Sequence, residues 1–118
     1  MRLEGKVKKG WGHEEIWITN DKYFSKFLHF DAGSMFSMHF HAEKVESWYV
    51  IRGKFVVEWI DTTNAKIHQK TLRIGDTWHN DALVPHRLIC LEPGTILEVS
   101  TPDSVEDNYR VMSGDSQK

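Results

Sequence analysis

The sequence has few cysteines, little net charge and no long apolar run, and each shortage excludes a class of protein. A single cysteine, Cys90, cannot form an internal disulfide, which argues against a small secreted domain held by disulfide bonds. The net charge of −2 gives no electrostatic basis for binding nucleic acid or an anionic membrane. No apolar run approaches the ~20 residues of a transmembrane helix, and the charged residues after Met1 do not fit a signal peptide. We therefore expect a cytoplasmic protein that binds neither nucleic acid nor membrane.

What the sequence does contain is a series of short segments rich in β-branched and aromatic residues. Turn sequences separate them at intervals of about ten residues, which predicts an all-β sandwich or barrel. At 118 residues the chain is long enough for one domain, which we place at residues 1–112, followed by a flexible polar tail at 113–118. We expect at most one short helical turn, over 103–111. The predicted strands span residues 14–19, 23–30, 36–41, 48–51, 54–60, 65–72, 76–78, 86–91 and 95–100.

One pattern of polar residues predicts a metal site. Residues 33–53 read Gly-x5-His-x-His-x4-Glu-x6-Gly, with His39, His41 and Glu46 as the polar fixed points. Alternate side chains of a strand share a face, so His39 and His41 point the same way. Glu46 comes five residues later, which leaves room for a tight bend and a return strand. A fourth candidate ligand, His86, stands at the head of another apolar strand.

These four residues suit one divalent metal ion. Imidazole nitrogens with carboxylate oxygens are ligands for Mn(II), Fe(II), Ni(II), Co(II) or Zn(II). Burying four ionisable groups together without a cation would leave them poorly satisfied. Four protein ligands leave two positions of an octahedral shell free. The set therefore predicts a site open to substrate rather than a closed structural one.

The motif at residues 33–53 resembles the first cupin motif at every fixed position. The second cupin motif, Gly-x5-Pro-x-Gly-x2-His-x3-Asn, is matched in part. Gly75 and His86 are in register. Asp81, Leu83 and Cys90 stand where the motif has Pro, Gly and Asn. The chain is thus similar to the cupin superfamily, and the resemblance implies a single-domain double-stranded β-helix, the jelly-roll cupin barrel.

Further segments resemble the cupin domain of mannose-6-phosphate isomerase and related sugar-phosphate enzymes, over roughly residues 11–110. Those isomerases often carry Gln where this chain has His39, so the site looks more like a general cupin metal site. The resemblance implies a metal-dependent sugar or sugar-phosphate isomerase with a small-molecule sugar substrate. The matching segments are Trp11-Gly12, Ser37 and residues 46–50, 85–88 and 97–100.

Two residues are candidates for catalysis. Alternation over residues 95–100 points either Ile96, Glu98 and Ser100 or the other three side chains inward. The isomerase resemblance favours Glu98 near the pocket, as a proton carrier or as a residue that orients a ligand histidine. Lys26 lies in an otherwise apolar strand, where it would hold a phosphate, a carboxylate or an enediolate oxygen. The alternative for Lys26 is an edge lysine with its ammonium in solvent.

Four further residues near the predicted metal site could contribute to it or play a structural role. Trp48 shares the face of Glu46 and would pack beside the metal. Arg87 is a second anion-binding candidate, although alternation from His86 turns it outward. His79 would close the mouth of the site or lie in solvent. Cys90 would line the pocket or simply fill the core.

Two other functions remain open. A histidine-rich open site also suits an Fe(II) dioxygenase, in which substrate and O₂ bind side by side. A non-enzymatic small-ligand-binding module is the third possibility, since cupin-like folds host many functions. Leftover apolar surface at residues such as Phe24, Ile51 and Val111 would suit a homodimer.

Overall fold

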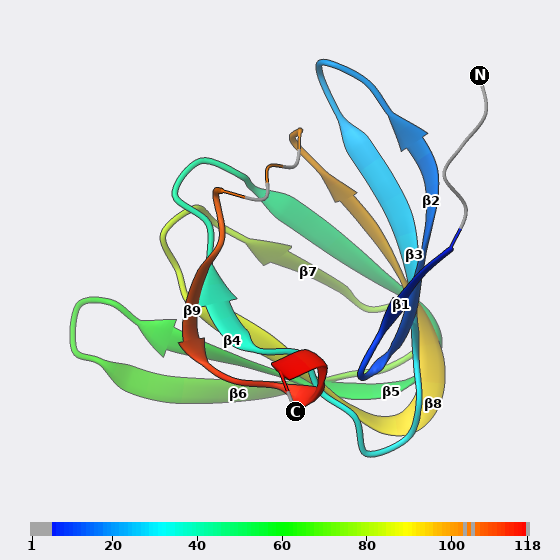
Figure 1. Ribbon diagram of the computed structural model, residues 1–118. Coiled ribbons are helices and arrows are strands. Elements are labelled where there is room, and N and C mark those ends of the chain that lie inside the picture. Colours follow the sequence, from blue (N-terminus) through cyan, green and yellow to red (C-terminus); the bar gives the residue numbers. More distant parts are fainter. Residues whose placement is uncertain (1–5, 103, 105, 118) are drawn as a thin grey trace.

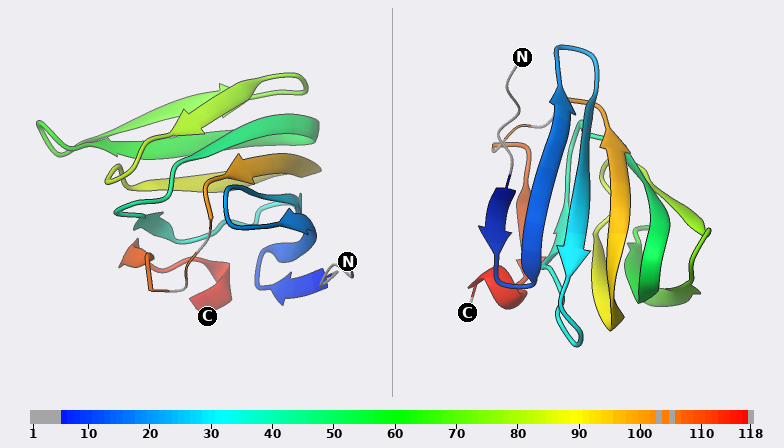
Figure 2. Two further views of the ribbon diagram at one scale, coloured as in Figure 1. Left: turned by 90° about the horizontal axis from the view of Figure 1, so that it is seen from above. Right: turned by 90° about the vertical axis from the view of Figure 1, so that its right-hand side faces the viewer.

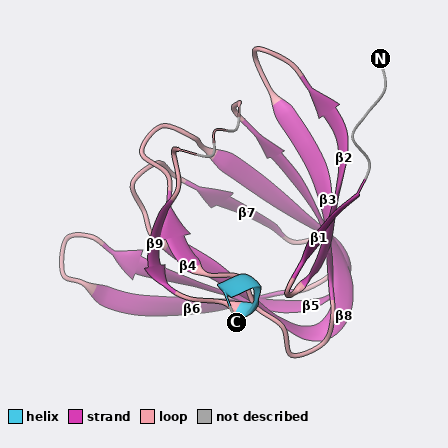
Figure 3. Ribbon diagram, viewed as in Figure 1, coloured by secondary structure: helices cyan, strands magenta, loops and turns pink. Residues whose placement is uncertain are grey.

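The all-β prediction is confirmed by the computed structural model, which describes residues 6–102, 104 and 106–117 (Figure 1). The only helix in that part of the chain is a 3₁₀ turn, η1 (Asp115–Gln117) (Figure 3). The strands are β1 (Lys6–Lys9), β2 (Gly12–Thr19), β3 (Phe24–Phe30), β4 (Met38–Phe40), β5 (Glu46–Asp61), β6 (Lys66–Leu72), β7 (Thr77–Asn80), β8 (His86–Ser100) and β9 (Tyr109–Met112).

Two long strands, β5 and β8, are shared between two layers. They pair with each other along almost their whole length, antiparallel, from the pair Glu46–Ser100 to the pair Trp59–His86. One half of this ribbon continues through β3, β2 and β1 on one side and β7 on the other. The strands of this layer lie side by side in the right-hand view of Figure 2. The other half continues through β4 and β9 on one side and β6 on the other.

The layers arise because the β5–β8 ribbon folds over on itself at Gly53 and Gly94. Gly53 has a φ of +88°, and a Cβ there would lie 2.6 Å from the Cα of Gly94. Only glycine combines this backbone conformation with such a close approach. The ladder shifts register on both sides of Gly53, at the bulges that accompany the bend. We predicted separate strands at 48–51 and 54–60, but they are parts of one continuous bent strand, β5. The strands predicted at 86–91 and 95–100 are likewise parts of β8.

The space between the layers is filled with large apolar side chains. Trp48, Phe55 and Leu88 are fully or almost fully buried, and Trp11 stacks on Phe30 with ring centroids 4.4 Å apart. Five aromatic residues belong to this core cluster, and Trp59 and Trp78 pack against it. The cluster comprises Trp11, Leu28, Phe30, Phe36, Trp48, Val50, Phe55, Val57, Leu72, Leu88, Cys90 and Ile96.

Both ends of the chain differ from prediction. β1 was missed, because its sequence is mostly lysine. The helical turn expected over 103–111 is wrong at residues 109–111, which belong to β9; residues 103 and 105 lie outside the described part. The flexibility of the tail stays a prediction. In the structure Ser116 Oγ accepts a hydrogen bond from Gly10 N at 3.0 Å. No helix of the described residues is long and apolar enough to cross a membrane.

Of the apolar residues suggested for a dimer contact, one is misplaced. Phe24, the first residue of β3, is buried at 8% exposure. Ile51 and Val111 are 40% and 48% exposed. The homodimer itself stays a prediction.

Candidate metal centre

The first motif places its histidines at one strand and its carboxylate at another. His39 lies in β4 and His41 follows directly after it. Phe40 turns to the opposite face and stacks on Tyr109, with ring centroids 5.1 Å apart. Glu46 is the first residue of β5, and its side chain is buried. The alternation predicted from the sequence therefore holds.

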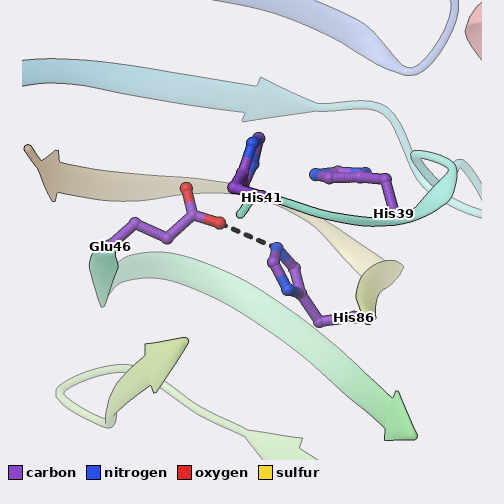
Figure 4. Close-up of side chains that lie close together, drawn as sticks. All are labelled: His39, His41, Glu46 and His86. Atoms are coloured by element: carbon purple, nitrogen blue, oxygen red, sulfur yellow. Dashed lines mark ion pairs between the residues drawn. The ribbon is translucent and has the colours of Figure 1, made fainter. Parts of the chain in front are cut away.

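The second motif contributes His86, the first residue of β8. His86 pairs directly with His39 in the β4–β8 ladder, which sets the two rings 4.9 Å apart. One ligand atom from each of the four residues lies within 4.8 Å of all the others. Figure 4 shows the three rings and the Glu46 carboxylate pointing toward one another. The sequence motifs thus converge on a cluster that could hold a metal ion.

All three histidines present the same nitrogen to the centre. The Nδ1–H groups donate to backbone carbonyls: His39 to Ser37 at 2.8 Å, His41 to Asp107 at 2.5 Å, His86 to Val84 at 3.0 Å. Because a carbonyl oxygen only accepts, these bonds fix the proton on Nδ1. The lone pair of each neutral ring is left on Nε2. In metal sites generally, such an acceptor at the other ring nitrogen orients the ligating histidine.

The buried polar atoms of the cluster need a cation. His86 Nε2 lies 2.8 Å from Glu46 Oε1, and it has no hydrogen-bond partner among the described residues. With its proton on Nδ1, the neutral ring points a lone pair at a carboxylate oxygen, which is repulsive unless a positive charge lies between them. The donor set of three imidazoles and one carboxylate fits a divalent transition metal.

The electrostatics keep His39 and Glu46 in the form that binds metal. Burial, together with the nearby His86, lowers the pKa of His39 to about 3, so this imidazole is neutral at pH 7. Burial works to raise the pKa of Glu46, but the neighbouring His86 and the positive charge of Lys44 outweigh it and hold the pKa well below its usual range. Neutral imidazoles and an ionised carboxylate are the states that ligate a metal.

Glu98 lies on the cavity wall beside this cluster. Of the two orientations considered for residues 95–100, the structure has Ile96, Glu98 and Ser100 inward. Glu98 Oε1 accepts a hydrogen bond from Trp48 Nε1 at 3.0 Å, while Oε2 has no hydrogen-bond partner among the described residues. Burial and the negative charge of Glu46 raise the pKa of Glu98 to about 7. Trp48 thus packs beside the centre, as its alternation with Glu46 predicted.

Lys26 is not an edge lysine, because β3 lies between β2 and β8. Its Nζ donates to Glu14 Oε2 at 2.9 Å and lies 3.8 Å from Glu98 Oε2. Burial works to lower the pKa of Lys26, but the carboxylates of Glu98 and Glu14 outweigh it, so the pKa is raised. Lys26 therefore stays a cation inside the cavity wall.

Lys44 was missed by the sequence reasoning. Its Nζ lies 3.6 Å from Glu46 Oε2 and 3.6 Å from Glu98 Oε2, and its side chain is 4% exposed. A signal was available, since Lys44 stands two residues before Glu46, inside the four-residue gap of the first motif. A lysine so placed neutralises two carboxylates that would otherwise repel each other.

These residues line one cavity of about 270 Å³. Three of the four metal-ligand candidates, His39, His41 and Glu46, line it together with Glu14, Lys26 and Glu98, while His86 lies buried behind them. The C-terminal residues Asn108 and Arg110 also line it. The complete lining is Lys9, Trp11, Glu14, Lys26, Leu28, Phe36, Ser37, His39, His41, Lys44, Glu46, Glu98, Ser104, Asn108, Arg110, Ser116 and Gln117.

Other candidates lie away from the cavity. Arg87 turns outward, as alternation indicated, and pairs with Glu58. Burial works to raise the pKa of Glu58, but hydrogen bonds from Gln69 and Arg87 lower it below its usual value. His79 is exposed in β7 and pairs with Asp81 at 2.9 Å. Cys90 is a core residue and does not line the cavity.

Comparison with known proteins bears on the fold. The protein family described as Cupin matches residues 5–100. No curated protein matches the chain. Among solved structures, KdgF from Halomonas sp. is 21% identical, with a TM-score of 0.69 over 80% of this chain and 81% of that chain.

Oxalate decarboxylases are also similar in structure. The enzyme from Bacillus subtilis is 19% identical, with a TM-score of 0.76 over 92% of this chain and 30% of that chain. The formate complex of the enzyme from Lactobacillus farciminis is 16% identical, with a TM-score of 0.78 over 92% of this chain and 34% of that chain. The chain therefore spans about a third of those enzymes. At identities this low, the structural similarity establishes a shared fold alone.

Proposed function

The chain belongs to the cupin family, and we propose that it is a metal-dependent isomerase of a small sugar phosphate. One divalent ion, of Mn, Fe, Ni, Co or Zn, would be held by the Nε2 atoms of His39, His41 and His86 and by the carboxylate of Glu46. The observation that carries this proposal is the orphaned Nε2 of His86 facing Glu46 Oε1 at 2.8 Å. The Mn(II) centres described for Bacillus subtilis oxalate decarboxylase, 18% identical, support a metal of this kind.

The reaction is a proton transfer between neighbouring carbons. When bound, the metal would supply a Lewis acid that polarises the substrate carbonyl. Glu98 takes the proton from the second carbon and returns it to the first, while the hydroxyl proton passes between the two oxygens. No electrons are gained or lost overall. Lys26 and Lys44, beside Glu98, offset the negative charge that develops on the substrate oxygens.

The cavity favours an anionic substrate over a neutral sugar. Four cationic side chains line it, against three carboxylates. A divalent ion would raise the surplus of positive charge further, and a phosphate would offset it. The cations are Lys9, Lys26, Lys44 and Arg110; the carboxylates are Glu14, Glu46 and Glu98. Oxalate, the substrate named for the oxalate decarboxylases, is likewise a small anion.

Hydrogen exchange at the second carbon tests the proposal. The metal-loaded protein is incubated in D₂O with a panel of aldose and ketose phosphates, and NMR follows deuterium at that carbon. We expect exchange and isomerisation with at least one member of the panel. Glu98→Gln should abolish both, whereas Glu58→Gln, a glutamate outside the cavity, should leave them intact.

Each failure has a distinct meaning. A metal-loaded protein that exchanges no proton on any sugar phosphate is not an isomerase of this class. Oxygen consumption coupled to product would then identify the dioxygenase. A ligand that raises the melting temperature without any turnover would identify the binding module.

A further inference from the structure

Asp107 joins the C-terminal segment to the loop that carries the metal-ligand candidates. Its Oδ1 accepts a hydrogen bond from Ala42 N at 2.6 Å. Its Oδ2 accepts from Glu43 N at 3.1 Å and from Lys44 N at 3.0 Å. Its backbone carbonyl accepts the Nδ1–H of His41 at 2.5 Å. One residue therefore satisfies three consecutive amides and also fixes the ring of a candidate ligand.

These bonds set the geometry of residues 42–44 in the connection between β4 and β5. Three successive N–H groups directed at one carboxylate hold the backbone of residues 42–44 in a single conformation. That conformation places Lys44 Nζ between the carboxylates of Glu46 and Glu98, 3.6 Å from each. The backbone of Val45 is tied separately, since its N–H donates to Thr101 Oγ1 at 3.1 Å. Removing the Asp107 side chain thus frees the amides of residues 42–44 while leaving the Glu46 side tied. The Asp107 carbonyl that accepts from His41 remains, but it is no longer held against the loop by the carboxylate.

The same segment is anchored at its far end. Asp115 N donates to the Met35 carbonyl at 3.0 Å, and Met35 N donates to Asp115 Oδ2 at 2.8 Å. Between the two anchors, Asn108 and Arg110 line the cavity. Residues 106–117, which we call the strap, therefore contact both the loop beside the metal centre and the space a substrate would fill.

We propose that Asp107 is a positioning residue of the metal centre and that docking of the strap and metal binding stabilise each other. The proposal rests on the proposed function only in requiring that the protein bind a divalent metal. The metal needs His41 with Nε2 directed at the centre. The Asp107 carbonyl holds that orientation, and the Asp107 carboxylate holds this carbonyl in place by binding the amides of residues 42–44. By linkage, whatever factor the docked strap adds to metal affinity, the metal must add to strap docking.

The first test measures Co(II) affinity and the Co(II) d–d absorption spectrum. Loss of a group that orients a metal ligand typically weakens binding about 10–100-fold. We expect Asp107→Ala to weaken Co(II) binding at least about tenfold and to alter the spectrum. Asp107→Asn keeps one accepting oxygen and should fall between that variant and the wild type. A merely structural role would lower stability without changing the spectrum of the bound metal.

A matched control is available in Asp61, which also caps a turn. Its Oδ1 accepts from Thr63 N at 2.9 Å, in the β5–β6 turn, and it does not line the cavity. Asp61→Ala should leave both the affinity and the spectrum unchanged. Equal Co(II) affinity and identical spectra for Asp107→Ala and the wild type would overturn the proposal.

The second test uses the wild-type protein alone, so it holds even if Asp107→Ala does not fold. Amide hydrogen exchange is followed at Ala42, Glu43 and Lys44 with and without saturating Zn(II). Linkage predicts that bound metal slows hydrogen exchange at these amides by about the same factor by which Asp107 raises the metal affinity, about tenfold or more. Unchanged exchange with metal bound refutes the coupling. A wild-type protein that binds no divalent metal refutes the proposed function instead, so the two failures are distinct.

Discussion

Metal binding should raise the melting temperature of this protein. The size of the shift depends on the metal concentration relative to the dissociation constant and on the unfolding entropy, which grows with chain length. The four donor atoms lie close together in the folded chain but are scattered in the unfolded chain, so a divalent ion binds the native state preferentially. At a free metal concentration 100 times the dissociation constant, this contributes about 2.7 kcal/mol. Removing the metal returns the protein to a state with an orphaned His86 Nε2 beside Glu46.

The corresponding shift in melting temperature follows from the unfolding entropy. That entropy is about 2.1 cal/mol/K per residue. For 118 residues it comes to about 250 cal/mol/K. The stabilisation of about 2.7 kcal/mol therefore raises Tm by about 11 °C. If replacing one ligand weakens binding about 100-fold, the same metal concentration contributes only about 0.4 kcal/mol, or about 2 °C.

Differential scanning fluorimetry of chelator-treated protein, with Mn(II), Co(II), Ni(II) or Zn(II) added back, checks these values. His39→Asn removes one ligand at a half-buried position and should abolish most of the shift. His79→Asn removes an exposed histidine outside the cavity and should shift as the wild type does. Equal shifts in the two variants, or no shift with any of the metals in the wild type, would refute the metal centre.

Three smaller predictions concern stability, each measured by urea unfolding. Glu58→Gln should cost about 1–2 kcal/mol at pH 7, because Arg87 loses a charged partner. The folded-state pKa of Glu58 is lowered, so this difference is present above pH ~4.5 and disappears as the pH falls through the lowered pKa. Gly53→Ala should cost at least about 1–3 kcal/mol for its positive φ alone. Leu83→Gly should stabilise by about 0.5–1 kcal/mol, since Leu83 has a φ of +69° and is 59% exposed.

Each of these has a result that would contradict it. A Glu58→Gln deficit that persists unchanged at pH 3 would mean that the charge contributes nothing. A neutral Gly53→Ala would show that the bend of the ribbon accepts a Cβ. A destabilising Leu83→Gly would mean that contacts of the leucine side chain outweigh its backbone strain.

The sequence was sufficient to predict the fold class and the local geometry of the motifs. Strand alternation correctly placed His39 and His41 on one face, and turn spacing correctly indicated an all-β domain. The same alternation placed Leu88 and Cys90 inward and Arg87 outward. These are properties of single strands, and short-range sequence patterns determine them.

Long-range arrangements were not predictable in this way. β9 pairs with β4 some seventy residues earlier in the chain, and nothing local in its four residues specifies that partner. Arg52-Gly53 was read as a turn between two strands, but the strand bends and continues through it. Lys44 was overlooked because its importance depends on Glu98, which only the folded structure brings within 3.6 Å.

The bend at Gly53 also explains why the spacing of the first motif cannot vary freely. In β5, Glu46 stands thirteen residues before Trp59, the residue that pairs with His86. In a straight ribbon this would separate Glu46 from His86 by on the order of 40 Å, yet Glu46 Oε1 and His86 Nε2 lie 2.8 Å apart. One residue inserted between Glu46 and the bend would turn that carboxylate to the outer face. Two inserted residues would restore the face but carry it about 7 Å too far. Length variation in related chains is therefore expected in the β5–β6 hairpin and not in this half of β5.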